Sequence, residues 1–346
     1  MSARKVEQED AVKHPRETTD LFGHRESETA LLNAYRSGRI PHAWLIGGAQ
    51  GIGKATLAYR MARFVLAHRN PLLPSVQRAE TLWVDPSDPV AHQIAAGSHG
   101  GLLTLERSLN DRGVMRTVIT VDETRETIGF FGSTAAVEGW RVCIVDTVDE
   151  LNANAANALL KVLEEPPRQS LFLLVSHAPA RVLPTIQSRC RKLPLRPLVA
   201  EDVIRAAAQA AQISPGDAAL AEAAAAAEGS VARALTLLGG DALKLQLRTA
   251  ALLGNLPRVD PRELHALGDS LGLSDRASLA AFVDSVDRWI AERLRADNAN
   301  ANLPRLARLA EVWEKINRAA RDTADYNLER KPLVFSVFGL LAEAIS

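Results

Sequence analysis

Cysteine is scarce in this sequence. Cys143 and Cys190 are the two cysteines, and neither lies in a C-x-x-C pair or beside a histidine at metal-ligand spacing. Such a pattern does not supply the four thiolate or imidazole ligands of a structural zinc site. We therefore expect two buried, reduced thiols, with neither a disulfide nor a zinc ion.

The chain also has no excess of one charge and no long apolar run, and it contains few aromatic residues. The chain has 41 basic and 41 acidic side chains, and 5% of its residues are aromatic. Proteins that bind DNA alone present a basic surface or aromatic platforms, so any DNA contact is expected to be local or shared with partners. No apolar run approaches the length of a membrane span, and the first 19 residues lack the apolar stretch of a secretory signal. A cytoplasmic protein without membrane contact is expected.

Continuous apolar runs alternate with helical patterns in the N-terminal half. The runs cover residues 43–46, 140–146 and 170–176, and helical spacing covers residues 25–36 and 54–68. Strands that are apolar throughout are typical of a parallel sheet with helices on both faces. The fold class predicted for this part is therefore α/β.

Shifts in composition predict four parts. Residues 1–18 are polar and are expected to form a mobile tail, and residues 19–196 form the α/β core. Alanine-rich helices over 197–241 and longer helices over 242–346 predict two further helical domains. Within the core, residues 71–113 resemble a loop-rich insertion that ends in a strand.

Helix signals in the C-terminal half define individual elements. Ser214 is expected to cap the second alanine-rich helix, whereas Pro261 indicates a turn. The helices are expected over residues 201–213, 215–228, 230–238, 274–296 and 303–324.

A glycine-rich turn joins the first strand to the following helix. Gly48, Gly51, Gly53 and Lys54 fit the pattern G-x-x-x-x-G-K. Such glycines let backbone N–H groups surround phosphate oxygens, the helix N-terminus adds a positive dipole, and the lysine can reach the outer phosphates. The turn therefore predicts a phosphate-binding loop (P-loop).

The residue after the lysine departs from this pattern. A serine or threonine is needed there to hold magnesium, and this chain has Ala55. Thr56 comes one residue later and is rotated by about 100° around the helix, so it is a poor substitute. Two alternatives stay open: a turn that only connects strand and helix, and a vestigial site that binds ATP weakly. No cofactor is required in either case.

A second departure follows the strand that ends in Asp146. This aspartate can support a magnesium ion, but the next position, where a glutamate would polarise water, is Thr147. Asp149 and Glu150 lie further along, where a surface or capping role is favoured over catalysis. Loss of hydrolysis is therefore predicted.

Together with these motifs, the helix over 152–167, its Leu-Glu-Glu-Pro-Pro ending and the triplet Ser188-Arg189-Cys190 resemble the AAA+ clamp-loader family over residues 20–240. The resemblance implies an AAA+ parallel-sheet P-loop core, a small helical lid and an all-α C-terminal collar that oligomerises. It also implies a component of the DNA polymerase III holoenzyme, whose DNA-directed DNA polymerase (nucleotidyltransferase) activity belongs to the complex. Many relatives carry a four-cysteine zinc module after the P-loop helix, and the insertion here contains no cysteine.

The resemblance assigns roles to several residues. Arg189 corresponds to an arginine finger that acts in trans on a neighbouring subunit's ATP, with a structural arginine as the alternative. Ser176 and His177 correspond to the sensor-1 region and Arg233 to sensor 2. For these sensor positions, hydrogen bonding within the fold is slightly favoured over nucleotide sensing.

Ala55 and Thr147 resemble the non-hydrolysing subunit of a clamp loader rather than its motor. The implied partners are the tau/gamma motor and delta subunits, and, through the assembly, the sliding clamp and primed DNA. One alternative is an active AAA+ motor that uses Lys54, Asp146 and Glu150. Another is a small-molecule phosphotransferase, for which no substrate-binding constellation is visible.

Overall fold

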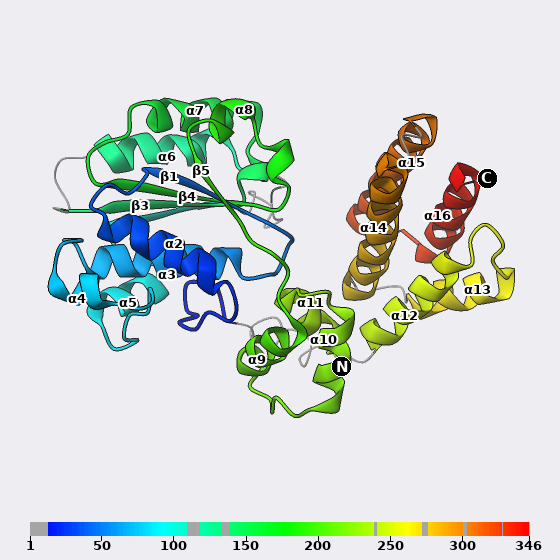
Figure 1. Ribbon diagram of the computed structural model, residues 1–346. Coiled ribbons are helices and arrows are strands. Elements are labelled where there is room, and N and C mark those ends of the chain that lie inside the picture. The colour runs from blue at the N-terminus through cyan, green and yellow to red at the C-terminus, as the bar shows by residue number, and fades with distance from the viewer. Residues whose placement is uncertain are drawn as a thin grey trace. The chain divides into compact units, whose positions relative to one another are not determined.

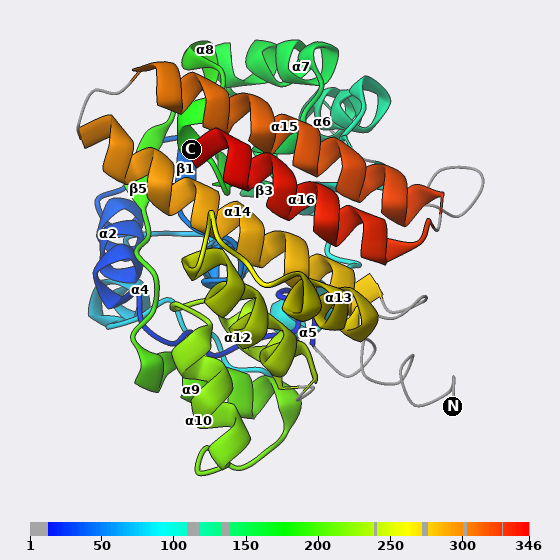
Figure 2. The ribbon, with the colours of Figure 1, turned by 90° about the vertical axis from the view of Figure 1, so that its right-hand side faces the viewer.

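The computed structural model describes residues 13–108, 116, 118–132, 139–238, 241–271, 276–299, 303–326 and 328–345. The chain divides into two compact units, Met1–Ala234 and Leu235–Ser346, which are described separately (Figures 1 and 2). The division predicted from composition, with boundaries after residues 18, 196 and 241, stays a prediction. Within the described residues, no helix is long and apolar enough to cross a membrane.

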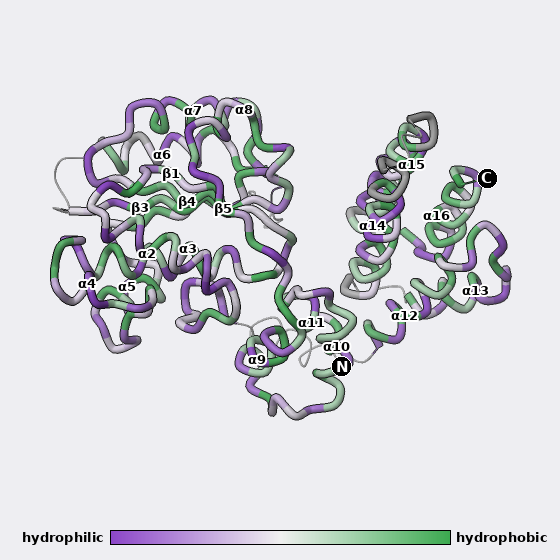
Figure 3. Tube along the Cα trace, in the orientation of Figure 1, coloured by the Kyte–Doolittle hydropathy of each residue, from purple (hydrophilic) through white to green (hydrophobic). Residues whose placement is uncertain are grey.

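A five-stranded parallel sheet forms the centre of the first unit. The strand order is β2-β3-β4-β1-β5, so β2 and β5 lie at the edges. All seven residues of β4 are buried, and Figure 3 shows hydrophobic residues concentrated along the inner strands. On the edge strand β5, Arg191, Lys192 and Pro194 are exposed. The strands are β1 (Ala43–Gly47), β2 (Leu102–Glu106), β3 (Arg141–Asp146), β4 (Ser170–Ser176) and β5 (Arg191–Pro194).

Helices cover both faces of the sheet, as the apolar strands predicted. Helices α2 and α3 lie on one face, whereas α6 and α7 lie on the other (Figure 1). The helices of this part are α2 (Arg25–Arg36), α3 (Lys54–Ala67), α4 (Pro74–Arg78), α5 (Pro89–Ala95), α6 (Val121–Gly132), α7 (Ala153–Glu164) and α8 (Pro184–Gln187), with short 3-10 turns η1 (Val148–Glu150) and η2 (Pro179–Arg181).

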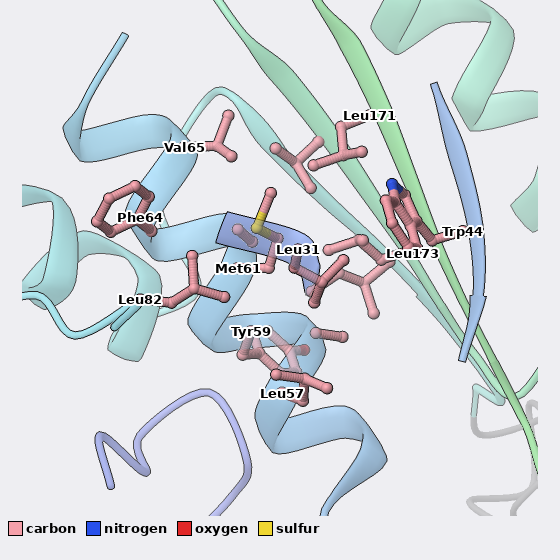
Figure 4. Close-up of a cluster of buried hydrophobic side chains, with 14 of the residues drawn as sticks. Leu31, Trp44, Leu57, Tyr59, Met61, Phe64, Val65, Leu82, Leu171 and Leu173 are labelled. Atoms are coloured by element: carbon pink, nitrogen blue, oxygen red, sulfur yellow. The ribbon is translucent and has the colours of Figure 1, made fainter. Parts of the chain in front are cut away.

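The core between α3 and the sheet fixes the helix that carries the P-loop lysine. Trp44 and Leu173 point from the strands toward Met61 and Phe64 of α3 (Figure 4). Trp44 and Met61 are fully buried. Burying a large side chain of this kind stabilises a fold by about 1.5–3 kcal/mol, so α3 is firmly held against β1.

Three alanine-rich helices follow the sheet: α9 (Ala200–Ala211), α10 (Ala218–Ala226) and α11 (Val231–Leu237). The prediction that Ser214 caps the second of them is wrong. The cap is Asp217, whose Oδ1 accepts hydrogen bonds from the N–H groups of Ala219 (2.8 Å) and Leu220 (3.3 Å). An ionised carboxylate is a strong acceptor at a helix N-terminus, whereas the Ser214 hydroxyl binds Gly216 in the preceding turn.

The second unit is helical and has its own apolar core. Phe282, Leu309 and Phe338 are among its most buried side chains. Pro261, taken from the sequence as a turn signal, starts a helix instead, because Asp260 caps it and proline fits the first helical turn. The helices are α12 (Asp241–Gly254), α13 (Pro261–Ser270), α14 (Arg276–Ala299), α15 (Leu303–Asp325) and α16 (Arg330–Ile345).

Backbone carbonyls near the N-terminus contact α3. Arg63 donates to the carbonyls of Arg16 (2.8 Å) and Thr18 (3.4 Å), and Arg60 donates to that of Thr19. Arg60 also forms a buried ion pair with Glu28 of α2. The described part of the predicted tail therefore lies on α3, while residues 1–12 of that prediction fall outside the described residues.

Candidate functional site: a P-loop with altered catalytic positions

The P-loop lies between β1 and α3, as the sequence predicted. Gly48 has φ +156°, and a Cβ there would lie 2.6 Å from the carbonyl oxygen of Leu195. Gly51 has φ +75°, and Gly53, with φ +95°, is the N-cap of α3. The turn therefore depends on glycine both for its backbone angles and for its close approach to the residue that follows β5.

Lys54 is folded back onto its own loop. Its Nζ donates to the carbonyl oxygens of Gly48 (2.8 Å) and Ala49 (2.5 Å), and the residue is 3% exposed. Burial lowers the pKa of Lys54 to about 8, against the opposing effect of the Asp146 and Asp149 carboxylates. A phosphate that enters the loop has to compete with two carbonyls for this amine.

The first turn of α11 contacts the P-loop directly. The Gly51 carbonyl accepts hydrogen bonds from the N–H groups of Val231 (2.9 Å) and Ala232 (3.4 Å). Arg233 follows on the same helix, where its Nη1 lies 3.8 Å from a Glu228 carboxylate oxygen. The predicted sensor-2 residue is thus carried by a helix that touches the loop, and a nucleotide contact from it stays a prediction.

Asp146 and Thr147 lie at the carboxyl end of β3. Asp146 is the register partner of Glu106 on β2. Burial raises the pKa of Asp146, as does the neighbouring Glu106, whereas Lys54 and His14 lower it. Thr147 is 5% exposed, and its Oγ1 lies 3.5 Å from Asp146 Oδ1. A buried hydroxyl therefore occupies the position where an ATPase of this type would need a carboxylate to activate water.

A cavity of about 260 Å³ opens beside the loop. Within it, Arg107 Nε lies 2.9 Å from Glu150 Oε2, so this carboxylate is ion-paired. Burial raises the pKa of Glu150, and Arg107 opposes the shift. The cavity is lined by Gln50, Glu106, Arg107, Asp146, Thr147, Glu150 and His177.

Asp149 connects the end of β3 to the end of β4. Its carboxylate accepts hydrogen bonds from Ser176 Oγ (2.7 Å) and from the N–H groups of His177 (2.5 Å) and Ala178 (3.3 Å). Three hydrogen bonds therefore fix this carboxylate against the end of β4 and the residues that follow it. The capping role considered for Asp149 is not at the next helix, because Asn152 caps α7. Asp149 instead holds the backbone after β4, and the hydroxyl of Ser176 is part of this connection.

His177 gives the fold a pH dependence that can be measured. Burial, together with the Lys54 cation, lowers the pKa of His177 to about 4. The pKa of this histidine is about 4 in the folded chain and 6.5 in the unfolded chain, so the unfolded chain binds the proton more tightly. The free energy of unfolding is therefore highest above pH 6.5 and decreases as the pH falls toward 4. We expect His177→Gln to reduce the loss between pH 6.5 and 5 by about 1 kcal/mol in urea unfolding, allowing for partial exposure.

The control is His92→Gln on α5, where the side chain is exposed. This variant should keep the pH dependence of the unmodified chain. An equal loss of stability in all three proteins would show that another group titrates in this range.

Arg189 follows α8, and its side chain contacts residues of α7 and α8. Nη2 lies 2.6 Å from Glu164 Oε1, and Nη1 donates to the Thr185 carbonyl at 2.9 Å. The guanidinium is about one-third exposed. The structure therefore places Arg189 at the surface, where it contacts α7 and α8 and not its own P-loop.

Thr56, the remaining residue of the predicted nucleotide site, lies half-buried on α3 after Ala55.

Both cysteines are free thiols. Cys143 is buried as predicted, whereas Cys190 is half-buried, and burial raises its pKa to about 12. Across the part of the chain that the structure describes, no group of three or more His, Cys, Asp and Glu residues is arranged to hold a metal ion.

The fold and the loop define an α/β P-loop protein in which the magnesium-ligand and water-activating positions hold Ala55 and Thr147. Comparison with known families adds a match to DNA polymerase III, delta subunit, over residues 23–199. The chain belongs to this family, which is a clamp-loader family with the AAA+ fold.

Individual relatives are similar over shorter stretches. The DNA polymerase III subunit delta' of Pseudomonas aeruginosa is 37% identical over 149 residues, which is 43% of this chain and 41% of the relative. The DNA polymerase III subunit gamma of Buchnera aphidicola subsp. Acyrthosiphon pisum is 32% identical over 191 residues, which is 55% of this chain and 48% of the relative. The chain thus spans less than half the length of these relatives.

Among solved structures, a DNA polymerase III gamma subunit-related protein from Thermotoga maritima has a TM-score of 0.45 and 16% identity. The alignment covers 91% of this chain and 99% of that one. A RuvB variant from the same organism has a TM-score of 0.42 and 17% identity, over 82% of this chain and 81% of that one.

Proposed function

We propose that this chain is the delta-prime subunit of a bacterial DNA polymerase III clamp loader and that it works without hydrolysing ATP. The observation that carries the proposal is the state of residues 147–150, which follow Asp146 at the end of β3. Asp149 is committed to three hydrogen bonds, Glu150 is paired with Arg107, and Thr147 replaces the base. A water molecule in this site has no free carboxylate after β3 to activate it.

The nucleotide side of the site supports the same conclusion. Ala55 offers no hydroxyl to magnesium, and the amine of Lys54 is already bound by loop carbonyls. Residual ATP binding at Gly48, Gly51, Gly53, Lys54, Thr56, Asp146 and Arg233 is therefore expected to be weak, and no cofactor is required.

In this proposal the chain contributes Arg189 to a neighbouring motor subunit. A guanidinium that approaches the γ-phosphate in trans stabilises the charge that develops as the phosphoryl group leaves. The partners are the tau/gamma motor and the delta subunit, with the sliding clamp and primed DNA reached through the assembly in the cytoplasm. Clamp opening and DNA synthesis are then properties of the complex.

Steady-state ATP hydrolysis tests the proposal. The purified chain alone should show no turnover above background, and Arg189→Ala should lower the DNA- and clamp-stimulated turnover of the assembly about tenfold, because one of its sites loses a charge that stabilises the transition state. Arg168→Ala is the control, because Arg168 is an exposed cation in the loop between α7 and β4. Turnover by the lone chain that depends on Glu150 would instead support a tau/gamma-like motor.

A further inference from the structure

The backbone that carries Arg189 is fixed by packing. Ile186 is 1% exposed, and it belongs with Leu163 of α7 to the core on this side of the sheet. Cys190 is half-buried and packs against the same core. The N–H of Arg189 donates to the Ile186 carbonyl at 3.1 Å. The residue therefore leaves a rigid base, and the position of its guanidinium depends on the contacts at the tip of the side chain.

Three acceptors bind the two terminal nitrogens of the guanidinium. Nη2 donates to Glu164 Oε1 at 2.6 Å, and Nη1 donates to the Thr185 carbonyl at 2.9 Å and to Ser188 Oγ at 3.4 Å. A guanidinium has five N–H donors in a fixed plane. Within the described residues, Nε makes no hydrogen bond, so one side of the guanidinium stays available to an acceptor from outside the chain.

Glu164 is an unusual residue for its place in the helix. It is the last residue of α7, where the helix dipole disfavours a carboxylate, and Pro166 and Pro167 follow. About half of its side chain is exposed, and an exposed ion pair contributes little to stability. Stability of the fold thus gives little reason for an anion at this position, whereas a need to orient the guanidinium gives one.

We propose that Glu164 is the positioning residue for Arg189: it holds the guanidinium in one orientation by its contact with Nη2, so that the neighbour's phosphate meets a preorganised donor. This proposal rests on the proposed function. Without the carboxylate, Arg189 would sample several rotamers and reach the γ-phosphate in a fraction of encounters, so turnover at saturating ATP would fall.

The test compares assemblies that contain Glu164→Ala, Glu164→Gln or Glu165→Ala. Glu165 is the neighbouring exposed glutamate, and the structure assigns its side chain no hydrogen bond or ion pair among the described residues, which makes it a matched control. We expect Glu164→Ala to lower kcat about three- to tenfold with KM for ATP unchanged. Glu164→Gln keeps an acceptor oxygen and should recover part of the loss, and Glu165→Ala should match the unmodified assembly.

The double variant Glu164→Ala with Arg189→Ala separates the two proposals. If Glu164 acts through Arg189, the double variant turns over no more slowly than Arg189→Ala alone. An unchanged or faster rate with Glu164→Ala, beside a clear loss with Arg189→Ala, would overturn the role of Glu164 and leave the proposed function intact. An unchanged rate with Arg189→Ala would overturn both. Equal thermal midpoints and equal incorporation into the assembly exclude misfolding, and Glu164→Gln supplies an isosteric variant for the same comparison.

Discussion

Replacing Glu28 with alanine is expected to destabilise the first unit by about 3–5 kcal/mol. Glu28 Oε1 lies 2.6 Å from Arg60 Nε, both side chains are 8% exposed, and the same oxygen accepts the N–H of Leu82 at 2.9 Å. The alanine variant leaves a buried guanidinium without its counter-charge and a buried N–H without its acceptor. Urea unfolding followed by circular dichroism measures the change.

Two variants control this experiment. Glu26→Ala removes an exposed carboxylate from the first turn of the same helix and should change stability by about 0.5 kcal/mol. Replacing Glu28 and Arg60 together with methionine removes both charges and should restore part of the loss. A loss below about 1 kcal/mol for Glu28→Ala would mean that water reaches Arg60 and that the pair behaves as a surface pair.

Gly51→Ala is expected to cost about 2–4 kcal/mol. The residue has φ +75°, and a Cβ would lie 2.3 Å from Ser230 Oγ and 2.7 Å from Ala232 Cβ. The serine hydroxyl can rotate away, but the alanine methyl is fixed on α11. The variant must therefore displace the first turn of α11 from the P-loop and weaken the hydrogen bonds that the Gly51 carbonyl accepts. Chemical unfolding measures the cost.

Gly38→Ala separates backbone strain from this contact. Gly38 has φ +66°, and a Cβ there would meet nothing within 4 Å. Its loss should be about 1–2 kcal/mol, which is the penalty for an L-residue in the left-handed region. Slower amide exchange at Val231 and Ala232 in the unmodified chain than in Gly51→Ala would link the loss to α11. Equal losses for the two glycines would contradict the contact.

The sequence predicted the sheet and the helices around it unevenly. Helix α2 begins and ends at the expected residues, 25 and 36, because its apolar spacing is regular. Helix α6 was missed because its buried positions include two threonines, Thr124 and Thr127. Their hydroxyls bond to backbone carbonyls, which satisfies them inside the helix and removes the apolar pattern that periodicity relies on.

The sequence also predicted some parts of the candidate site and missed others. Gly48, Lys54 and Asp146 could be brought together from sequence, because all strands of a parallel sheet end at the same edge, even though β4 lies between β1 and β3. The contact between Arg189 and Glu164 joins residues 25 positions apart. It depends on how α7 and α8 pack, and no periodicity or spacing encodes that.

The sequence of β5, one of the two edge strands of the sheet, has a consequence for aggregation. An edge strand presents a row of backbone donors and acceptors on which a strand from another molecule can align, and this is a common start of aggregation. On β5, the exposed Arg191 and Lys192 bring like charges together when two copies approach, and Pro194 lacks the N–H that a pairing strand would need. The β5 edge of the sheet therefore disfavours strand-to-strand pairing between two copies of this chain.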